Sequence, residues 1–127
     1  MQYQISDYEL ELMKIIWANG GTALYIEIVA GLENKGQCWT KNTIITLLSR
    51  LVEKGILKTN KIGRKNKYVA LLSVDDYQSY QTSQFVDKVY EGDMNSFIST
   101  LINNNLLSSK DYEELLKRWK KEVEKNE

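Results

Sequence analysis

Histidine is absent from this sequence of 127 residues, and cysteine occurs once, as Cys38. A single thiol cannot form an intramolecular disulfide, and a chain without histidine lacks the usual ligands of a zinc site. The same absence removes the Ser-His, Cys-His and His-acid arrangements on which most hydrolases depend. We therefore expect neither a bound metal nor a cofactor, and an enzyme is the least favoured of the classes considered below.

Long apolar segments are also missing. No apolar run approaches the roughly 20 residues that cross a bilayer, and no signal peptide opens the chain. We expect a cytoplasmic protein without membrane insertion. Apolar residues still make up 43% of the sequence, which is enough for a hydrophobic core and too much for a disordered chain.

Charge is balanced overall but is divided unevenly along the chain. Residues 1–74 carry ten Lys/Arg against six Asp/Glu, a net charge of +4, and residues 75–127 carry seven against eleven, a net charge of −4. From Lys35 to Lys67, nine basic residues accompany a single acid, Glu53. Such a basic segment is typical of proteins that bind phosphates, and a solvated charged face is the alternative.

The apolar pattern of residues 5–55 predicts three helices. A capping box between Ser6 and Glu9 starts the first, and Gly20-Gly21 end it. Thr22 is expected to cap the second helix, and Thr40 caps the third, which ends at Gly55. The expected buried sides are Ile26, Val29, Ala30 and Leu32 in the second helix, and Ile44, Leu47, Leu48, Leu51 and Val52 in the third.

A hairpin is predicted after these helices. Residues 56–61 and 67–72 are strand-like, and the basic residues 62–66 form the turn between them. Three helices followed by a hairpin are the order of a winged helix-turn-helix. We therefore predict a mainly α protein with a small β-hairpin wing, in which residues 1–72 form a winged helix DNA-binding domain and residues 73–127 a helical dimerisation domain.

The third helix has the properties of a DNA-reading helix. Its apolar stripe would pack inward, while its other face offers amide, hydroxyl and basic groups to the major groove. Asn42 is suited to adenine, and the methyl groups of Thr43 and Thr46 to thymine, whereas Arg50 and Lys54 are better placed for phosphates. An ordinary polar face is the alternative. The candidate DNA-binding residues here are Thr40, Lys41, Asn42, Thr43, Thr46, Arg50 and Lys54.

The predicted wing contains no acidic residue, since none lies between Lys54 and Val74. A cationic hairpin neutralises backbone phosphates and releases counterions, which gives affinity and register but little sequence selectivity. A hairpin that only aids solubility is the alternative. The candidate phosphate-binding residues of the wing are Lys58, Lys61, Arg64, Lys65 and Lys67.

Residues 73–127 predict short helices rich in aromatic side chains. Ser73 caps the first, which closes near Gly92, and Ser108 or Ser109 starts the last. These segments are too short to bury their aromatic residues within one chain, so we predict a two-chain interface, with packing onto the winged helix as the alternative. A dimer also suits a two-fold operator. The candidate dimerisation residues are Phe97, Ile98, Leu101, Ile102, Tyr112, Leu115, Leu116 and Trp119.

A series of short motifs runs in order through nearly the whole chain. It consists of Ile5 to Met13, Ile16-Trp17, Trp39-Thr40, Thr43-Ile44, Thr46 to Leu51, Lys54-Gly55, Tyr68, Phe85-Val86, Lys88 to Tyr90 with Gly92, and Leu107-Ser108. This series resembles the penicillinase-repressor family. That family includes bacterial repressors of β-lactamase and methicillin-resistance operons, together with copper-responsive repressors.

The resemblance implies a homodimeric repressor on double-stranded operator DNA of dyad symmetry. It also implies a partner, a membrane β-lactam sensor that triggers proteolysis in the dimerisation region and so separates the dimer. Where those members carry an Asn-Phe cleavage bond, this sequence has Thr100-Leu101 as the cleavage-equivalent site. The cysteine cluster of the copper-responsive members is absent. Ile45 stands where some members have a basic residue, so their operator sequence is not carried over.

A winged helix used only for protein interaction, without DNA binding, is the alternative function. The basic wing distinguishes the two, because a protein-binding wing has no need of nine cations against one anion. From the sequence we therefore expect a DNA-binding transcriptional repressor of the β-lactam-resistance type.

Overall fold

The structure, a computed structural model, describes residues 4–126. Its contacts divide the chain into two compact units, residues 1–80 (unit 1) and residues 81–127 (unit 2). Among the residues described, no helix is both long and apolar enough to cross a membrane.

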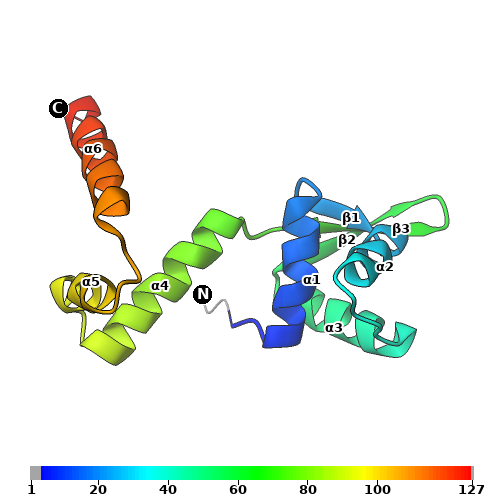
Figure 1. Cartoon of the computed structure of the whole chain (residues 1–127). Coiled ribbons are helices and arrows are strands. Elements are labelled where there is room, and N and C mark those ends of the chain that lie inside the picture. The colour runs from blue at the N-terminus through cyan, green and yellow to red at the C-terminus, as the bar shows by residue number, and fades with distance from the viewer. Residues whose placement is uncertain (1–3, 127) are drawn as a thin grey trace. The chain divides into compact units, whose positions relative to one another are not determined.

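Unit 1 contains three helices and a small sheet, drawn from blue to green in Figure 1. The helices are α1 (Asp7–Ala18), α2 (Tyr25–Asn34) and α3 (Lys41–Glu53), and the strands are β1 (Thr22–Leu24), β2 (Leu57–Ile62) and β3 (Lys65–Ala70). The sheet is antiparallel, with the order β1-β3-β2. This arrangement confirms the predicted winged helix-turn-helix class of fold.

Strand β1 corrects one expectation. Thr22 does not cap α2, because its backbone pairs with Val69 in the sheet, and the helix begins three residues later. Gly21 leads into the strand with φ 88°, and its carbonyl accepts a hydrogen bond from the Ala70 amide at 2.8 Å. The side chain of Ala23 then enters the core. The start of α2 is held instead by Glu27, whose carboxylate accepts from the Leu24 amide at 2.8 Å.

The later start of α2 also changes its buried face. Ile26 and Ala30 were expected to be buried but are exposed, Ile26 by 67%, whereas Ile28 and Leu32, one turn apart, are fully enclosed. The predicted stripe of α3 is buried except for Val52, which is 36% exposed. The core of unit 1 consists of Leu12, Met13, Ile15, Ile16, Ala23, Ile28, Leu32, Ile44, Leu47, Leu48, Leu51, Ile56, Leu57, Tyr68 and Leu72.

Helix α4 (Val74–Tyr90) begins in unit 1 and ends in unit 2. Its start is capped as predicted, since the Asp76 amide donates to the Ser73 hydroxyl at 3.0 Å. Its first turns belong to unit 1, because Tyr77 lies against Trp17 with ring centroids 5.6 Å apart. The indole N–H of Trp17 donates to the Leu72 carbonyl at 2.9 Å. The compact units therefore divide between residues 80 and 81, whereas the functional domains were predicted to divide between residues 72 and 73.

Unit 2 adds α5 (Met94–Asn103) and α6 (Ser109–Lys125) to the end of α4. Ser108 is the cap of α6, with its hydroxyl accepting from the Asp111 amide at 3.0 Å. Three rings, those of Phe85, Tyr90 and Phe97, form a cluster with centroids 5.5–5.9 Å apart. Val86 is the one apolar side chain that is buried in the described part of unit 2.

Candidate nucleic-acid interface

Helix α3 is fixed to unit 1 by one face and exposed on the other. Ile44, Leu48 and Leu51 are at most 2% exposed and lie in the core. The candidate residues Lys41, Asn42, Thr43, Thr46 and Arg50 are all exposed. A rigid helix with a free polar face meets the geometric requirement for entering a major groove.

The start of α3 is held by two threonines. The Thr40 hydroxyl accepts from the Thr43 amide at 3.2 Å, and the two hydroxyl oxygens are 2.9 Å apart. The hydroxyls of Thr40 and Thr43 therefore take part in capping the N-terminus of α3. The remaining amides of the first turn, together with Lys41, leave a positive helix terminus that favours phosphate.

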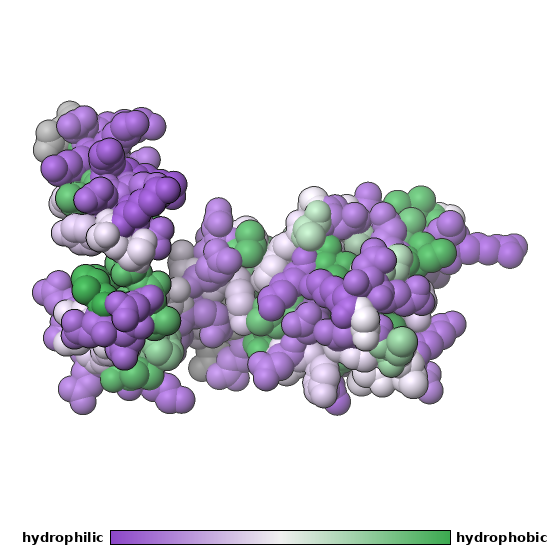
Figure 2. Space-filling model, viewed as in Figure 1, coloured by the Kyte–Doolittle hydropathy of each residue, from purple (hydrophilic) through white to green (hydrophobic). Residues whose placement is uncertain are grey.

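The hairpin of β2 and β3 extends away from the helices of unit 1 (Figure 1). Lys58, Lys61, Arg64 and Lys65 are exposed on it, and the turn is tightened by Gly63 at φ 64°. At the hairpin end, Figure 2 shows hydrophilic surface beside an apolar patch, and Ile62, the last residue of β2, is 55% exposed. Exposed cations on a hairpin are accessible to backbone phosphates, and such contacts fix the register of the protein on the duplex without reading its sequence.

Lys67 has a different environment from the other wing cations. It is only half-exposed. The pKa of Glu27 is lowered chiefly by the hydrogen bond from the Leu24 amide, then by Asn19, with a smaller contribution from the charge of Lys67. Lys67 therefore lies near enough to Glu27 for its charge to be felt by that carboxylate.

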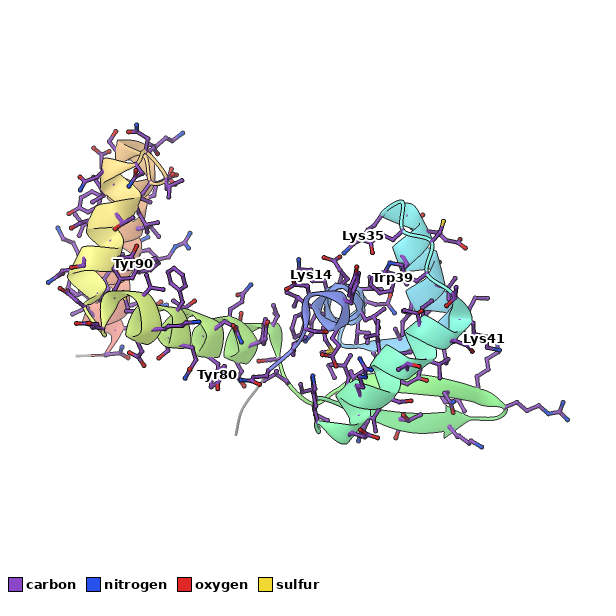
Figure 3. All side chains as sticks on the ribbon, turned by 90° about the horizontal axis from the view of Figure 1, so that it is seen from below. Lys14, Lys35, Trp39, Lys41, Tyr80 and Tyr90 are labelled. Atoms are coloured by element: carbon purple, nitrogen blue, oxygen red, sulfur yellow. The ribbon has the colours of Figure 1, made fainter. Side chains whose placement is uncertain are left out.

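The two basic elements meet at one hollow. Lys41, near the start of α3, lies on the side of unit 1 that bears the hairpin (Figure 3). Arg64 and Lys65 of the wing line the same hollow of about 350 Å³ as Lys41 does. We call it the α3–wing hollow. Its cations come from two segments more than twenty residues apart in sequence, so the structure brings together one predicted cation of the helix and two of the wing.

Lys54 does not belong to this surface. Its ammonium is 2.7 Å from Glu9 Oε1 and 3.0 Å from the Gln4 carbonyl. Glu9 is 1% exposed, and the same oxygen accepts from the Ser6 amide at 2.9 Å. We therefore propose that Lys54 compensates a buried carboxylate and does not bind phosphate.

Ile45, which the sequence analysis noted but did not include among the candidate DNA-binding residues, is 37% exposed and lines the α3–wing hollow. Its spacing was the available signal, since it lies four residues after Lys41 and four before Ser49, both exposed. An apolar residue at such a position is easily assigned to the core stripe.

The predicted dimerisation residues lie in unit 2 and remain largely accessible. Exposed fractions are 46% for Ile102, 49% for Tyr112, 48% for Leu115 and 64% for Trp119. The other four are half-buried: Phe97, Ile98, Leu101 and Leu116. Thr100 and Leu101, at the cleavage-equivalent bond, lie within α5, where the Thr100 hydroxyl donates to the Ser96 carbonyl at 3.1 Å.

The fold and the basic surface together define a winged helix-turn-helix of the nucleic-acid-binding type. The chain belongs to the penicillinase repressor family, whose model matches residues 5–121.

Individual relatives agree with this assignment. The chain is 36% identical to the penicillinase repressor of Bacillus licheniformis, over 88% of this chain and 86% of that protein. It is 31% identical to the methicillin resistance regulatory protein MecI of Staphylococcus aureus, over 89% of this chain and 90% of that protein.

Solved structures are similar as well. The DNA binding domain of the repressor BlaI shares 40% identity at a TM-score of 0.51, over 58% of this chain and 88% of that one. An hsRosR-S4 complex has a TM-score of 0.53 at 15% identity, over 82% of this chain and 91% of that one, and this likeness concerns the fold alone.

Proposed function

We propose that this chain is a sequence-specific DNA-binding transcriptional repressor that acts as a homodimer on a dyad operator. The observation that carries the proposal is the α3–wing hollow. There Lys41 of the reading helix and Arg64 and Lys65 of the wing line one surface, beside the exposed polar face of α3. The family and the named DNA-binding domain of BlaI support the same function.

The homodimer is supported by the state of unit 2. Large apolar side chains on α6 are exposed in the single chain, with Trp119 at 64%. Figure 2 shows further apolar surface over α5. Exposed patches of this kind mark interaction sites, and a second copy provides a self-complementary partner. Two copies also present two reading helices to an operator with two half-sites.

Derepression would then follow from disruption of unit 2. In the β-lactam-resistance type of system, a membrane sensor with a protease would act on the repressor in unit 2, where Thr100-Leu101 is the bond equivalent to the cleavage bond of those members. This bond lies within α5, so cleavage there requires local unfolding of that helix. Loss of the dimer would release DNA without any change in α3.

The experiment that tests DNA binding is a salt titration with the promoter duplex of the gene that encodes this protein. With roughly four to eight phosphate contacts per dimer, the slope of log K against log salt is about −4 to −7. A slope near zero, or no binding at low salt, contradicts the proposal. It would favour the alternative, a winged helix that serves protein interaction only.

A further inference from the structure

One apolar side chain lies among the polar groups on the exposed face of α3. Ile45 keeps 37% of its surface exposed, and helical spacing puts it on the face that also carries Lys41, Asn42 and Ser49. Single exposed apolar residues are normal on protein surfaces. Ile45, however, lies in a hollow that contains a second exposed apolar side chain.

The α3–wing hollow holds a second exposed apolar side chain. Ile26 of α2 is 67% exposed and lines the hollow together with Ile45. The same hollow is lined by Lys41, Arg64 and Lys65. Two branched apolar side chains therefore lie among three cations, on the side of unit 1 where Lys41 projects (Figure 3).

A ligand that matches this surface must combine negative charge with small apolar groups. Duplex DNA does so, because phosphates border the major groove and thymine carries a methyl group on its groove edge. That methyl is the only apolar group that the four base pairs present there. Isoleucine is suited to the contact, because its branched side chain is stiff and loses little freedom on binding.

We propose that Ile45 is a specificity-determining residue that contacts the 5-methyl group of a thymine in the operator. The inference rests on the proposed function and adds a base preference to it. Residues three apart on a helix are separated by about 4.5 Å along its axis, comparable with the roughly 3.4 Å between stacked bases. For a helix that lies along the groove, this spacing puts Asn42 and Ile45 over neighbouring base pairs.

The test starts from a duplex that the full-length protein selects out of a random pool. Each thymine is then replaced singly by deoxyuridine, which lacks the methyl group but keeps the hydrogen-bonding edge. We expect replacement at one position in each half-site to weaken binding about threefold to fivefold, the effect of leaving one methyl group unburied. This measurement uses the unaltered protein, so it does not depend on how well a variant folds.

An Ile45→Ala variant assigns the methyl contact to its side chain. It should bind the thymine duplex about threefold to fivefold more weakly per half-site and no longer distinguish thymine from deoxyuridine. Val52→Ala is the matched control. Val52 is on the same helix and 36% exposed, but it lies about 10.5 Å further along the axis. This variant should keep the full preference for thymine.

Three results would contradict the proposals, and each is distinct. Equal binding of thymine and deoxyuridine duplexes at every position overturns the inference but leaves DNA binding intact. An Ile45→Ala protein that still distinguishes the two bases also overturns it, because another side chain then reads the methyl. Failure to select any duplex overturns the proposed function itself.

Discussion

The two units of this protein differ in how far each one buries its own apolar residues. In unit 1, all three helices and the sheet contribute side chains to one core, and residues such as Leu12, Ile28 and Leu48 have no exposed surface. In unit 2, Val86 is buried, whereas Leu106 and Trp119 are 69% and 64% exposed. Unit 1 therefore resembles a self-sufficient domain, and unit 2 resembles half of an interface.

Helix α6 shows the same lack of burial within a single helix. Tyr112, Leu115, Leu116, Trp119 and Val123 follow helical spacing, but the described residues of the chain bury none of them. An amphipathic helix is stable mainly when its apolar face is covered. We infer that a second chain covers it, and that the stability of unit 2 depends on protein concentration while that of unit 1 does not.

The largest expected effect comes from removing unit 2. A chain truncated after Tyr80 keeps Tyr77 on the core and should remain folded as a monomer. Its affinity for a two-half-site operator should fall about 10²- to 10⁴-fold, because the two half-site contacts no longer act together. Sedimentation of both chains and binding to full and half operators measure this.

The half operator is the control for this truncation. Both chains should bind a single half-site with similar affinity, since α3 and the wing are unchanged. If the full-length chain remained monomeric at tens of micromolar, unit 2 would not be a dimer interface. Its exposed apolar face would then need a partner other than a second copy of the chain.

The second prediction compares one leucine from each unit. Leu48→Ala empties a fully buried site, and it should lower the free energy of unfolding of unit 1 by about 2–5 kcal/mol at any protein concentration. Leu115→Ala should shift the melting temperature of the full chain by an amount that changes with concentration, because it weakens the dimer. Thermal unfolding at two concentrations at least fiftyfold apart distinguishes them. Identical concentration dependence of the two variants would contradict the assignment of Leu115 to an interface.

Local signals in the sequence were sufficient to predict most of unit 1. The caps at Ser6, Thr40 and Ser73 and the C-terminal glycine Gly55, at φ 77°, are confirmed. Each depends on a few neighbouring residues, which is why periodicity and cap rules identify them. Strand β1 was missed because it is three residues long. Its strand character comes from pairing with β3, about 45 residues away, and no local pattern contains that contact.

The candidate site was predicted less completely, for a related reason. The exposed cations of α3 and the wing follow from composition, but the partner of a given cation does not. Lys54 and Glu9 lie 45 residues apart, so the sequence gives no sign that one neutralises the other. Ile45 was noted but not assigned to the site, because its exposure depends on how α2 and the wing flank α3.

The third prediction tests the revised role of Lys54. In Lys54→Met, the carboxylate of Glu9 loses its cation while remaining buried, which should lower the free energy of unfolding by about 1–3 kcal/mol. The salt slope of DNA binding should not change, because no phosphate contact is lost. Urea unfolding and the salt titration measure the two effects separately. A smaller salt slope with unchanged stability would mean that Lys54 contacts a phosphate and does not stabilise the Glu9 carboxylate.

The same pair gives a pH dependence. Burial raises the pKa of Glu9, but hydrogen bonds from Lys54 and Ser6 outweigh this and hold the pKa below its ordinary value of 4.5. A lowered pKa in the folded state means that the stabilisation is present above the ordinary value and is lost as the pH falls through the folded-state pKa. The difference in stability between wild type and Lys54→Met should therefore shrink on acidification below pH 4.5.

The smallest expected effect concerns one wing cation. Lys65→Ala removes one proposed phosphate contact per protomer, so the slope of log K against log salt should become less negative by about 2 for the dimer. Stability should stay within about 0.5 kcal/mol of wild type, because the side chain is exposed. Lys14→Ala is the matched control, since Lys14 is an exposed cation of unit 1 that pairs with Glu11 at 3.6 Å. It should leave the slope unchanged.

Affinity for operator and for unrelated duplexes should fall together in Lys65→Ala, because a phosphate contact carries no base information. A selective loss of operator binding would mean that the wing reads bases and that α3 alone does not determine specificity.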